Sequence, residues 1–306
     1  MEDYPKTLLD FEERFSTEEA CREYLFKLRW PEGFQCPKCG YGKAWPIKRY
    51  FLCECTHCGF QVYIMAGTIF QDTKKSLRLW FRAIWYITSQ KYGTNALGVQ
   101  RALGLGSYHT AWTWLHKLRR AMVRPGRDRL FGTVQIDEIY IGGEKPGKRG
   151  RGAAGKTLVV IMVEIKEGKT GRIRLSRVAD ASGPSLEGAI VESVEPGSVV
   201  QTDGWEGYNR LSELGYRHEI IRKEAVIGKN VLPKVNRVAA LLKRWLLGSY
   251  QGRVESSHLG YYLDEYTFRF NRRTSRSRGK LFYRLLHEAV AIKPVSIKDI
   301  HGGATS

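Results

Sequence analysis

The sequence predicts an α/β protein in which a mixed sheet flanked by helices follows a small metal-binding ribbon and a helical unit. Three observations support this prediction. Two C-x-x-C pairs lie near the start of the chain, helical periodicity follows them, and β-branched runs then alternate with helical segments. A chain of 306 residues has room for two or three domains, one of them with a large hydrophobic core.

The charge of the chain indicates the kind of partner it binds. Fifty Lys and Arg against thirty-one Asp and Glu give a net charge of +19, which favours a polyanion, DNA or RNA before a membrane. No window approaches the roughly 18 apolar residues that span a bilayer. The first residues, MEDYPKTLLDFEERF, are acidic where a secretory signal would be basic. We therefore expect a protein of the reducing cytoplasm.

Residues 1–30 are predicted to contain a short amphipathic helix. Ser16 to Glu19 resembles a capping box, apolar residues follow at helical spacing, and Pro31 ends the run. Cys21 falls on the apolar side of this helix, so we interpret it as a packing residue.

Residues 31–70 are predicted to form a zinc ribbon. The spacing C-x2-C-x15-C-x2-C is typical of structural zinc, because two knuckles bring four thiolates to one tetrahedral ion. Gly40 and Gly59 would supply the positive φ that each knuckle needs. Cys53 is an additional thiol outside the two pairs, and His57 lies inside the second knuckle. The alternative to a zinc site is that the thiols only pack in a core. The predicted zinc ligands are Cys36, Cys39, Cys55 and Cys58.

Residues 71–125 are predicted to be helical. The apolar pattern that starts at Leu77 is followed by TNALGVQRALGLG and by a helix from Ser107 to Met122, an arrangement that resembles a helix-turn-helix. Any helical bundle gives similar periodicity, so packing alone is the alternative. Basic residues favour DNA contact by this unit, and PGRDR at 125–129 reads as a linker. These basic residues are Lys117, Arg119 and Arg120.

Two β-branched runs each carry an acidic residue where a core strand is expected. Asp137 lies within TVQIDEIYI, and Asp203 ends SVVQTD. A carboxylate withdrawn from water costs several kcal/mol unless a cation accompanies it. In a basic chain the cation that fits is a hard divalent metal ion. The alternatives are that Asp203 only begins a turn and that Asp137 pairs with an arginine.

The order of the elements predicts a ribonuclease-H-like sheet in a domain of residues 130–292. Three strands in an antiparallel meander precede alternating helices and strands. In that layout the first and fourth strands are neighbours, which would place Asp137 beside Asp203. The predicted strands are 133–141, 157–165, 172–178, 198–203 and 218–222, and the predicted helices are 184–194, 205–214, 232–248, 256–271 and 279–292, with a frayed tail over 293–306.

Two basic segments of this domain are candidates for phosphate contact. Gly142 to Lys148 matches the first part of a P-loop, but Arg149 stands where a Ser or Thr should bind magnesium. We interpret this glycine-rich segment as a mobile hairpin tip that grips phosphates, or as a solvated loop. The run RRTSRSRGK at 272–280 is predicted to track DNA.

The helix predicted over 232–248 offers further site residues. Asn236 and Lys243 are seven residues apart and so share one face. The amide of Asn236 could complete a metal site while Lys243 holds a phosphate. The alternative is that Asn236 caps the helix and Lys243 is solvated.

Several motifs together resemble the bacterial insertion-sequence transposases of the family numbered fifteen-ninety-five. These are DDE enzymes, with a ribonuclease-H-like core and an N-terminal zinc ribbon. The likeness covers about residues 20 to 290. The motifs are CPKCG with CTHCG, VQIDEIYIGG, QTDGWEGY, LPKVNRVAALLKRWLLGSYQG and YLDEYTFRFNRR.

The resemblance implies an enzyme that excises and inserts its own element with two Mg²⁺ or Mn²⁺ ions. Asp137, Asp203 and Asn236 would be the metal ligands, and Lys243 matches the trailing basic residue. Asn236 stands where many relatives of the wider class have Glu, which leaves less negative charge for the ions. The acidic residues that could replace it are Glu224, Glu255 and Glu265, of which Glu255 is best placed by order.

The implied partners are double-stranded DNA, both the terminal inverted repeats and the target, and further copies of this chain on that DNA. No membrane and no small-molecule substrate is expected, and the protein would be associated with the nucleoid. Two other classes of function fit the same residues. A ribonuclease-H-like nuclease would cut without joining, and a zinc-ribbon regulator that has lost catalysis would only bind DNA.

Overall fold

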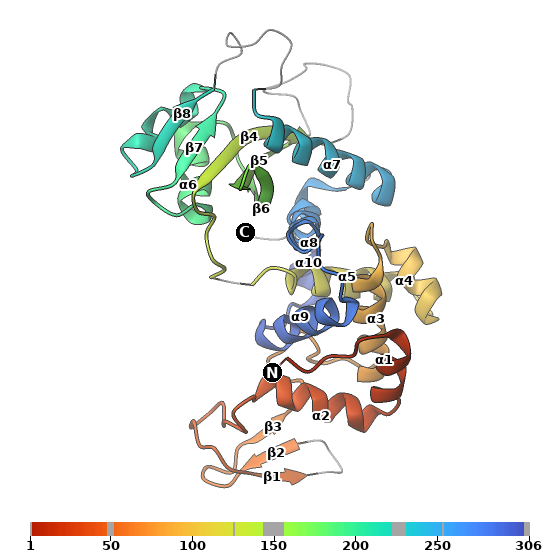
Figure 1. Ribbon diagram of the computed structural model, residues 1–306. Helices are drawn as coiled ribbons and strands as arrows, with labels where there is room; N and C mark the ends of the chain where they lie inside the picture. Colours follow the sequence, from red (N-terminus) through yellow and green to blue (C-terminus); the bar gives the residue numbers. More distant parts are fainter. Residues whose placement is uncertain are drawn as a thin grey trace. The chain divides into compact units, whose positions relative to one another are not determined.

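The chain forms two compact units in the computed structural model, which describes residues 2–47, 52–124, 126–142, 156–221, 231–252 and 254–302 (Figure 1). The first unit comprises Met1–Arg124 and Ser275–Ile300, and the second comprises Pro125–Thr274 and His301–Ser306. Among the described residues, no helix is long and apolar enough to cross a membrane. Apart from Gly142, the P-loop-like segment lies outside the described residues, and so does Glu224.

The first unit is mainly helical and has an aromatic core. Phe15 packs edge-on against Phe81, and Phe81 against Phe282, with ring centroids 4.9 and 5.7 Å apart. These rings come from three segments distant in sequence, so the core closes only when the chain folds back. Its helices are α1 (Leu8–Arg14), α2 (Glu18–Arg29), α3 (Leu77–Ser89), α4 (Ala96–Leu103), α5 (Tyr108–Arg120) and α9 (Arg278–Ala291).

The start of the chain holds two helices where one was predicted. Helix α1 has seven residues, too few to be stable alone, but Phe11 is buried against Trp85 and Phe282. The predicted capping box does not form, because the N-cap of α2 is Thr17 and the residue three positions later is Ala20. Thr17 caps α2 by accepting from the amide of Ala20, whereas the Glu18 carboxylate accepts from the amides of Leu77 and Arg78. Glu18 thus caps α3, and Cys21 is buried as expected.

The last long helix belongs to the first unit. The sequence placed 279–292 with the sheet domain, whereas α9 packs against α2 and α3, and the amide of Ile69 donates to the carbonyl of Ala289 at 3.3 Å. The tail predicted to be frayed contains a short helix, α10 (Ile297–His301), with Ile300 buried. Sequence periodicity identifies such helices but carries no information on which core they join.

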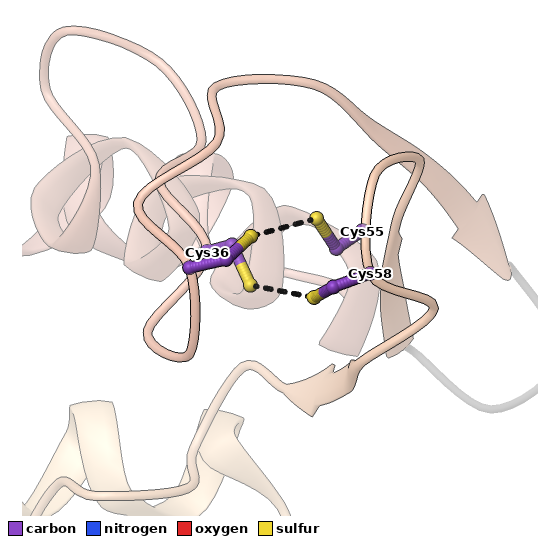
Figure 2. A group of neighbouring side chains, drawn as sticks. Cys36, Cys55 and Cys58 are labelled. Atoms are coloured by element: carbon purple, nitrogen blue, oxygen red, sulfur yellow. Dashed lines mark hydrogen bonds between the residues drawn. The ribbon is translucent and has the colours of Figure 1, made fainter.

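The ribbon within the first unit is a three-stranded antiparallel sheet in the order β1-β2-β3. Its strands are β1 (Ala44–Ile47), β2 (Leu52–Cys55) and β3 (Gln61–Tyr63). Two turns that flank these strands bring the cysteines together (Figure 2).

The second unit contains a five-stranded mixed sheet in the order β6-β5-β4-β7-β8. Strand β5 runs antiparallel to β4 and β6, while β4, β7 and β8 are parallel to one another. This is the predicted ribonuclease-H-like arrangement, with the first and fourth strands adjacent. The strands are β4 (Thr133–Ile141), β5 (Thr157–Lys166), β6 (Lys169–Val178), β7 (Val199–Thr202) and β8 (Arg217–Ile220).

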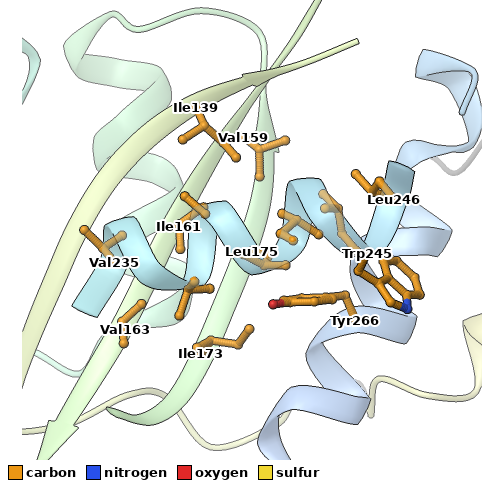
Figure 3. Close-up of a cluster of buried hydrophobic side chains, with 14 of the residues drawn as sticks. Ile139, Val159, Ile161, Val163, Ile173, Leu175, Val235, Trp245, Leu246 and Tyr266 are labelled. Atoms are coloured by element: carbon orange, nitrogen blue, oxygen red, sulfur yellow. The ribbon is translucent and has the colours of Figure 1, made fainter. Parts of the chain in front are cut away.

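Each face of this sheet is covered by its own hydrophobic core. One face packs against α7 (Pro233–Tyr250) and α8 (Leu259–Asn271), with Ile161, Val163 and Trp245 between the layers (Figure 3). The other packs against α6 (Gly183–Ser193) and η2 (Glu206–Ser212). The segment η2 is a 3-10 helix where an α-helix over 205–214 was predicted. The short 3-10 helix η4 (Ser256–His258) precedes α8.

Candidate functional site

Four thiols of the ribbon converge as their spacing predicts. Cys36, Cys39, Cys55 and Cys58 place their sulfur atoms within 4.8 Å of one another. The closest pairs, Cys36 with Cys58 and Cys39 with Cys55, are 3.7 and 3.6 Å apart. Zinc–sulfur bonds of about 2.3 Å at tetrahedral angles separate two thiolates by roughly 3.8 Å. The geometry therefore fits zinc.

The two knuckles are built alike. In the first, the amide of Gly40 donates to the carbonyl of Cys36 at 2.8 Å; in the second, the amide of Gly59 donates to the carbonyl of Cys55 at 3.0 Å. Both glycines have positive φ, 74° and 66°, as the sequence predicted. Desolvation raises the pKa of Cys55, but the amides of Cys58 and His57 donate to its sulfur and bring that pKa down to about 6. At Cys55 this favours the thiolate that a metal requires, whereas at Cys39 the amide of Tyr41 lowers the pKa but desolvation and hydrogen bonds with the other three cysteines raise it to about 12.

The ribbon has a very small hydrophobic core. Its fully buried members are Phe34, Cys36, Cys55 and Val62, two of which are themselves candidate zinc ligands. A core of this size does not stabilise a fold without a metal or a disulfide. The described cysteines are all free thiols, so the metal is the remaining source of stability. Cys53 lies outside the four-cysteine cluster.

Strands β4 and β7 bring the two predicted acids to one place. Thr133 is opposite Val199 and Gln135 is opposite Gln201. The same offset, continued by two residues, sets Asp137 level with Asp203, which directly follows β7. Neighbouring strands lie about 4.8 Å apart. Asp137 is only half buried and Asp203 is exposed, so desolvation is weaker than the sequence pattern suggested. Two acids at corresponding positions of neighbouring strands are the stronger reason to expect a cation.

Tyr208 gives independent evidence that acidic groups gather here. Its buried hydroxyl donates to Glu138 Oε2 at 2.7 Å. Burial raises the pKa of Tyr208 well above its usual value, and the charges of Glu138, Asp137 and Asp203 raise it further. Three carboxylates therefore act on one phenol. Neither Glu138 nor Tyr208 was predicted as a site residue, although Glu138 is the immediate neighbour of Asp137.

Gln135, on the central strand β4, forms hydrogen bonds with the start of α7. Its Oε1 accepts from the amides of Lys234 and Val235, at 3.0 and 3.4 Å. Helix α7 has no capping side chain of its own, so Gln135 serves two amides that would otherwise lack an acceptor. Its Nε2 donates to Gln201 at 3.3 Å, and Gln201 donates to Glu219 at 3.1 Å. A row of side chains thus crosses β4, β7 and β8.

We expect Gln135→Leu to destabilise the first turn of α7 by about 1–3 kcal/mol, because two buried amides lose their acceptor. Faster hydrogen exchange at Lys234 and Val235 would measure this effect. Gln201→Leu is the matched control, since it removes a neighbouring amide that does not touch the helix. Equal exchange rates in the two variants would contradict the capping role of Gln135.

Asn236 lies in this first turn and is not the helix cap. Its Nδ2 donates to the carbonyl of Leu232 at 3.0 Å, which orients the side-chain amide. Gln135 precedes Asp137 by two residues on the same strand face and bonds to the amides of Lys234 and Val235, the two residues before Asn236. Lys243 is exposed two turns further along α7.

The two described fallback acids have different surroundings. Glu265 is fully buried, pairs with Arg269 at 2.8 Å and accepts from Tyr250, so its role is structural. Glu255 is exposed and precedes Ser256, whose hydroxyl is 2.6 Å from that of Thr157. Thr157 is paired with Ile141 at the end of β4. Glu255 therefore lies near the end of β4, which is four residues beyond Asp137.

Most of the basic residues chosen in the helical unit do not face solvent. Arg119 is 1% exposed, and Lys117, whose pKa burial lowers, donates to the carbonyl of Ile69 at 3.4 Å. Only Arg120 is exposed. Charges on α5 thus give little support to DNA contact by this helix. The sequence could not reveal this, because helical periodicity does not show that α5 is enclosed on most sides.

The basic run 272–280 is also partly engaged within the protein. Arg273 donates to the carbonyls of Thr170 and Gly171, and Arg272 stacks over Phe268 at 4.2 Å. Lys280 pairs with Glu2 at 3.3 Å. The remaining arginines of the run, Arg276 and Arg278, are exposed.

Two family matches identify the class of protein. Residues 129–271 match the ISXO2-like transposase domain, and residues 16–61 match a transposase zinc-ribbon domain. The protein is therefore a transposase, an enzyme that cuts and joins DNA and so binds it. In particular, the chain belongs to the ISXO2-like insertion-sequence transposases with an N-terminal zinc ribbon. Both the fold and the zinc ribbon predicted from sequence are confirmed.

One relative is similar over most of both chains. It is described as an uncharacterized protein in transposable element ISH50 of Halobacterium salinarum (strain ATCC 700922 / JCM 11081 / NRC-1). It is 26% identical over 294 residues, which are 87% of this chain and 94% of the relative.

Two solved structures show weaker likenesses. The catalytic core domain of BIV integrase has 16% identity and a TM-score of 0.29, over 44% of this chain and 80% of that one. A simian T-cell lymphotropic virus intasome, in complex with PP2A regulatory subunit B56 gamma, has 17% identity and a TM-score of 0.34, over 60% and 70%. At TM-scores this low, neither likeness bears on the function of this chain.

Proposed function

We propose that this transposase cuts and joins DNA at a metal site held by Asp137, Asp203 and Asn236. The observation that supports the proposal is the parallel register of β4 and β7, because the same offset continued two residues beyond Gln135 and Gln201 would bring the two aspartates level. Carboxylate and amide oxygens are the ligands that Mg²⁺ and Mn²⁺ prefer. Two such ions, when bound, would activate a nucleophilic oxygen and stabilise the leaving 3′-oxygen.

The residues at the proposed site have different roles. The aspartates supply the negative charge that holds the ions. The hydrogen bonds of Gln135 to the start of α7, on the strand face that Asp137 shares, support the assignment of Asn236 as the third ligand. Lys243, exposed on the same helix, holds a DNA phosphate and contributes no sequence preference.

The proposed substrates are the terminal inverted repeats of the element and a target duplex, bound by more than one copy of this chain. The name of the relative in transposable element ISH50 supports an element-encoded role. The high positive charge of the chain supports binding to a polyanion, +19 in all. Association with the nucleoid would follow from that binding.

Incubation of the purified protein with DNA that carries the flanking repeats and with Mg²⁺ tests this function. Products in which the repeat end is joined to a second duplex are expected. Nicked ends without joined products would favour a nuclease instead. Binding without any Mg²⁺-dependent cleavage would favour a regulator.

Asn236→Ala is expected to reduce cleavage and to raise the Mg²⁺ concentration needed for half-maximal rate, because one oxygen ligand is lost. Asn236→Asp, which keeps an oxygen at this position, should retain activity. Glu255→Ala is the matched comparison, since Glu255 is the exposed alternative acid near the end of β4. Full activity in Asn236→Ala together with loss in Glu255→Ala would transfer the role of third ligand to Glu255.

A further inference from the structure

The turn that carries Asp203 is held by hydrogen bonds at its far end. Strand β7 ends at Thr202, whose carbonyl accepts from the amide of Ile221 at 2.9 Å. Asp203 follows directly and is exposed. Its Oδ1 accepts from the amide of Trp205 at 3.0 Å, and the indole Nε1 of Trp205 donates to the carbonyl of Ala181 at 2.9 Å. The far end of the turn is therefore attached to the segment before α6.

Thr202 holds the near end of this turn from within the protein core. Val200, two residues earlier on β7, belongs to the core beneath α6 and η2, so alternation places the side chain of Thr202 on that face. Thr202 is fully buried, and its hydroxyl accepts from the amide of Gly204 at 3.2 Å. Such a bond to an amide two residues later stabilises a turn. Because Thr202 and Gly204 flank Asp203, the bond between them limits how the backbone of Asp203 can move.

His218 on β8 orients the Thr202 hydroxyl. Its Nε2 lies 2.8 Å from Thr202 Oγ1. In the parallel pair of β7 and β8, His218 is opposite Val200, so it shares a sheet face with Thr202. Burial lowers the pKa of His218, which favours the neutral ring at neutral pH. A neutral ring can accept the hydroxyl proton at Nε2 while the hydroxyl oxygen accepts from the amide of Gly204, so the two hydrogen bonds of Thr202 are compatible.

A second residue of β8 also contacts this turn. Gly204 has a φ of 83°, and a Cβ atom at this position would lie 2.6 Å from Cγ2 of Ile220. Glycine therefore permits both the backbone conformation and the close approach of Ile220. Strand β8 thus bears on the turn twice, through His218 and through Ile220. None of the residues proposed as metal ligands lies on β8, so its contribution to the site is one of support.

We propose that His218 is a positioning residue, which acts through the Thr202 hydroxyl to hold Asp203 in the geometry that binds a metal ion. This inference rests on the proposed function, because it takes Asp203 as a ligand. Metal ligands must be held within about 0.5 Å of the productive geometry by the groups around them. Loss of the groups that orient a ligand typically weakens metal affinity by about 10–100-fold.

The first test compares Thr202→Val with Thr202→Ser. Valine lacks the hydroxyl, so it should raise the Mg²⁺ concentration needed for half-maximal cleavage about tenfold, with a rate near that of the wild type at saturating Mg²⁺. Serine keeps the hydroxyl and should resemble the wild type. His218→Ala should match Thr202→Val, whereas His218→Gln, whose side-chain amide can replace the ring nitrogen, should require less Mg²⁺ than His218→Ala.

The double variant Thr202→Val/His218→Ala tests whether the two residues act as one unit. If His218 acts through Thr202, the double variant should need no more Mg²⁺ than either single variant. Tyr216→Phe is the matched control, because the Tyr216 hydroxyl is buried in the same core and donates to the carbonyl of Val194 at 3.0 Å. Its loss should lower the thermal stability without changing the Mg²⁺ requirement.

A second measurement needs neither metal nor DNA. In EDTA, hydrogen exchange at the amide of Gly204 should be faster in Thr202→Val and in His218→Ala than in the wild type, and unchanged in Tyr216→Phe. If the wild type cleaves and needs Asp203, the proposal is overturned by an unchanged Mg²⁺ requirement in both variants, by additive effects in the double variant, or by unchanged exchange at Gly204. Wild-type protein that cleaves no repeat DNA, or Asp203→Asn that cleaves normally, would refute the proposed function and this role with it.

Discussion

Asp137→Asn and Asp203→Asn are each expected to abolish DNA cleavage and joining while DNA affinity stays nearly unchanged. The register of β4 and β7, continued two residues beyond Gln135 and Gln201, would bring the two carboxylates level, so each substitution removes one of the charges proposed to hold the metal ions. Stabilisation by such ions is worth several kcal/mol, which corresponds to a loss of rate on the order of a thousandfold. Asparagine keeps the size of the side chain and leaves the phosphate-binding cations in place.

Single-turnover cleavage of repeat-end DNA measures the rate, and a gel-shift titration at fixed salt measures the affinity. Glu192→Gln is the matched control, because it also removes one negative charge but lies exposed on α6. It should leave both quantities unchanged. Cleavage by either aspartate variant within tenfold of the wild-type rate would rule out the proposed metal site.

Removal of zinc is expected to unfold the ribbon, residues 33–65. Its few buried apolar residues cannot stabilise it alone, and structural zinc contributes about 10–16 kcal/mol to folding in small zinc-binding peptides at neutral pH. Chelation should therefore reduce the far-UV dichroism and release one zinc ion per chain. Cys36→Ser should have the same effect without a chelator.

Cys53→Ser is the matched control for this second prediction. Cys53 lies on the same small sheet, between Pro46 and Val62, but outside the four-cysteine cluster. This variant should retain a full equivalent of zinc and an unchanged dichroism spectrum. A ribbon that keeps its structure after complete chelation would show that zinc is not what stabilises it.

Much of the fold could be predicted from the sequence because the patterns that indicate it involve residues close together along the chain. Four cysteines at fixed spacing, with glycines that permit positive φ, define the ribbon wherever it lies in the molecule. Alternation and helical periodicity predicted the strands and most helices to within a few residues, and Asp137 and Asp203 stood out as acids in apolar strands. Helix α1 was missed because its stability comes from Phe11 in a core built from distant helices.

The sequence by itself predicted the cluster of four cysteines and most strands and helices, because these signals depend on residues close together along the chain. Only the tertiary structure decided the rest. It assigned α9 to the first unit and buried Arg119. It also made Glu18 an acceptor for the first turn of α3, 59 residues later in the chain, and Gln135 an acceptor for the first turn of α7, 99 residues later. Such contacts form between groups that become neighbours only when the chain is packed. A local pattern of residues therefore does not predict them.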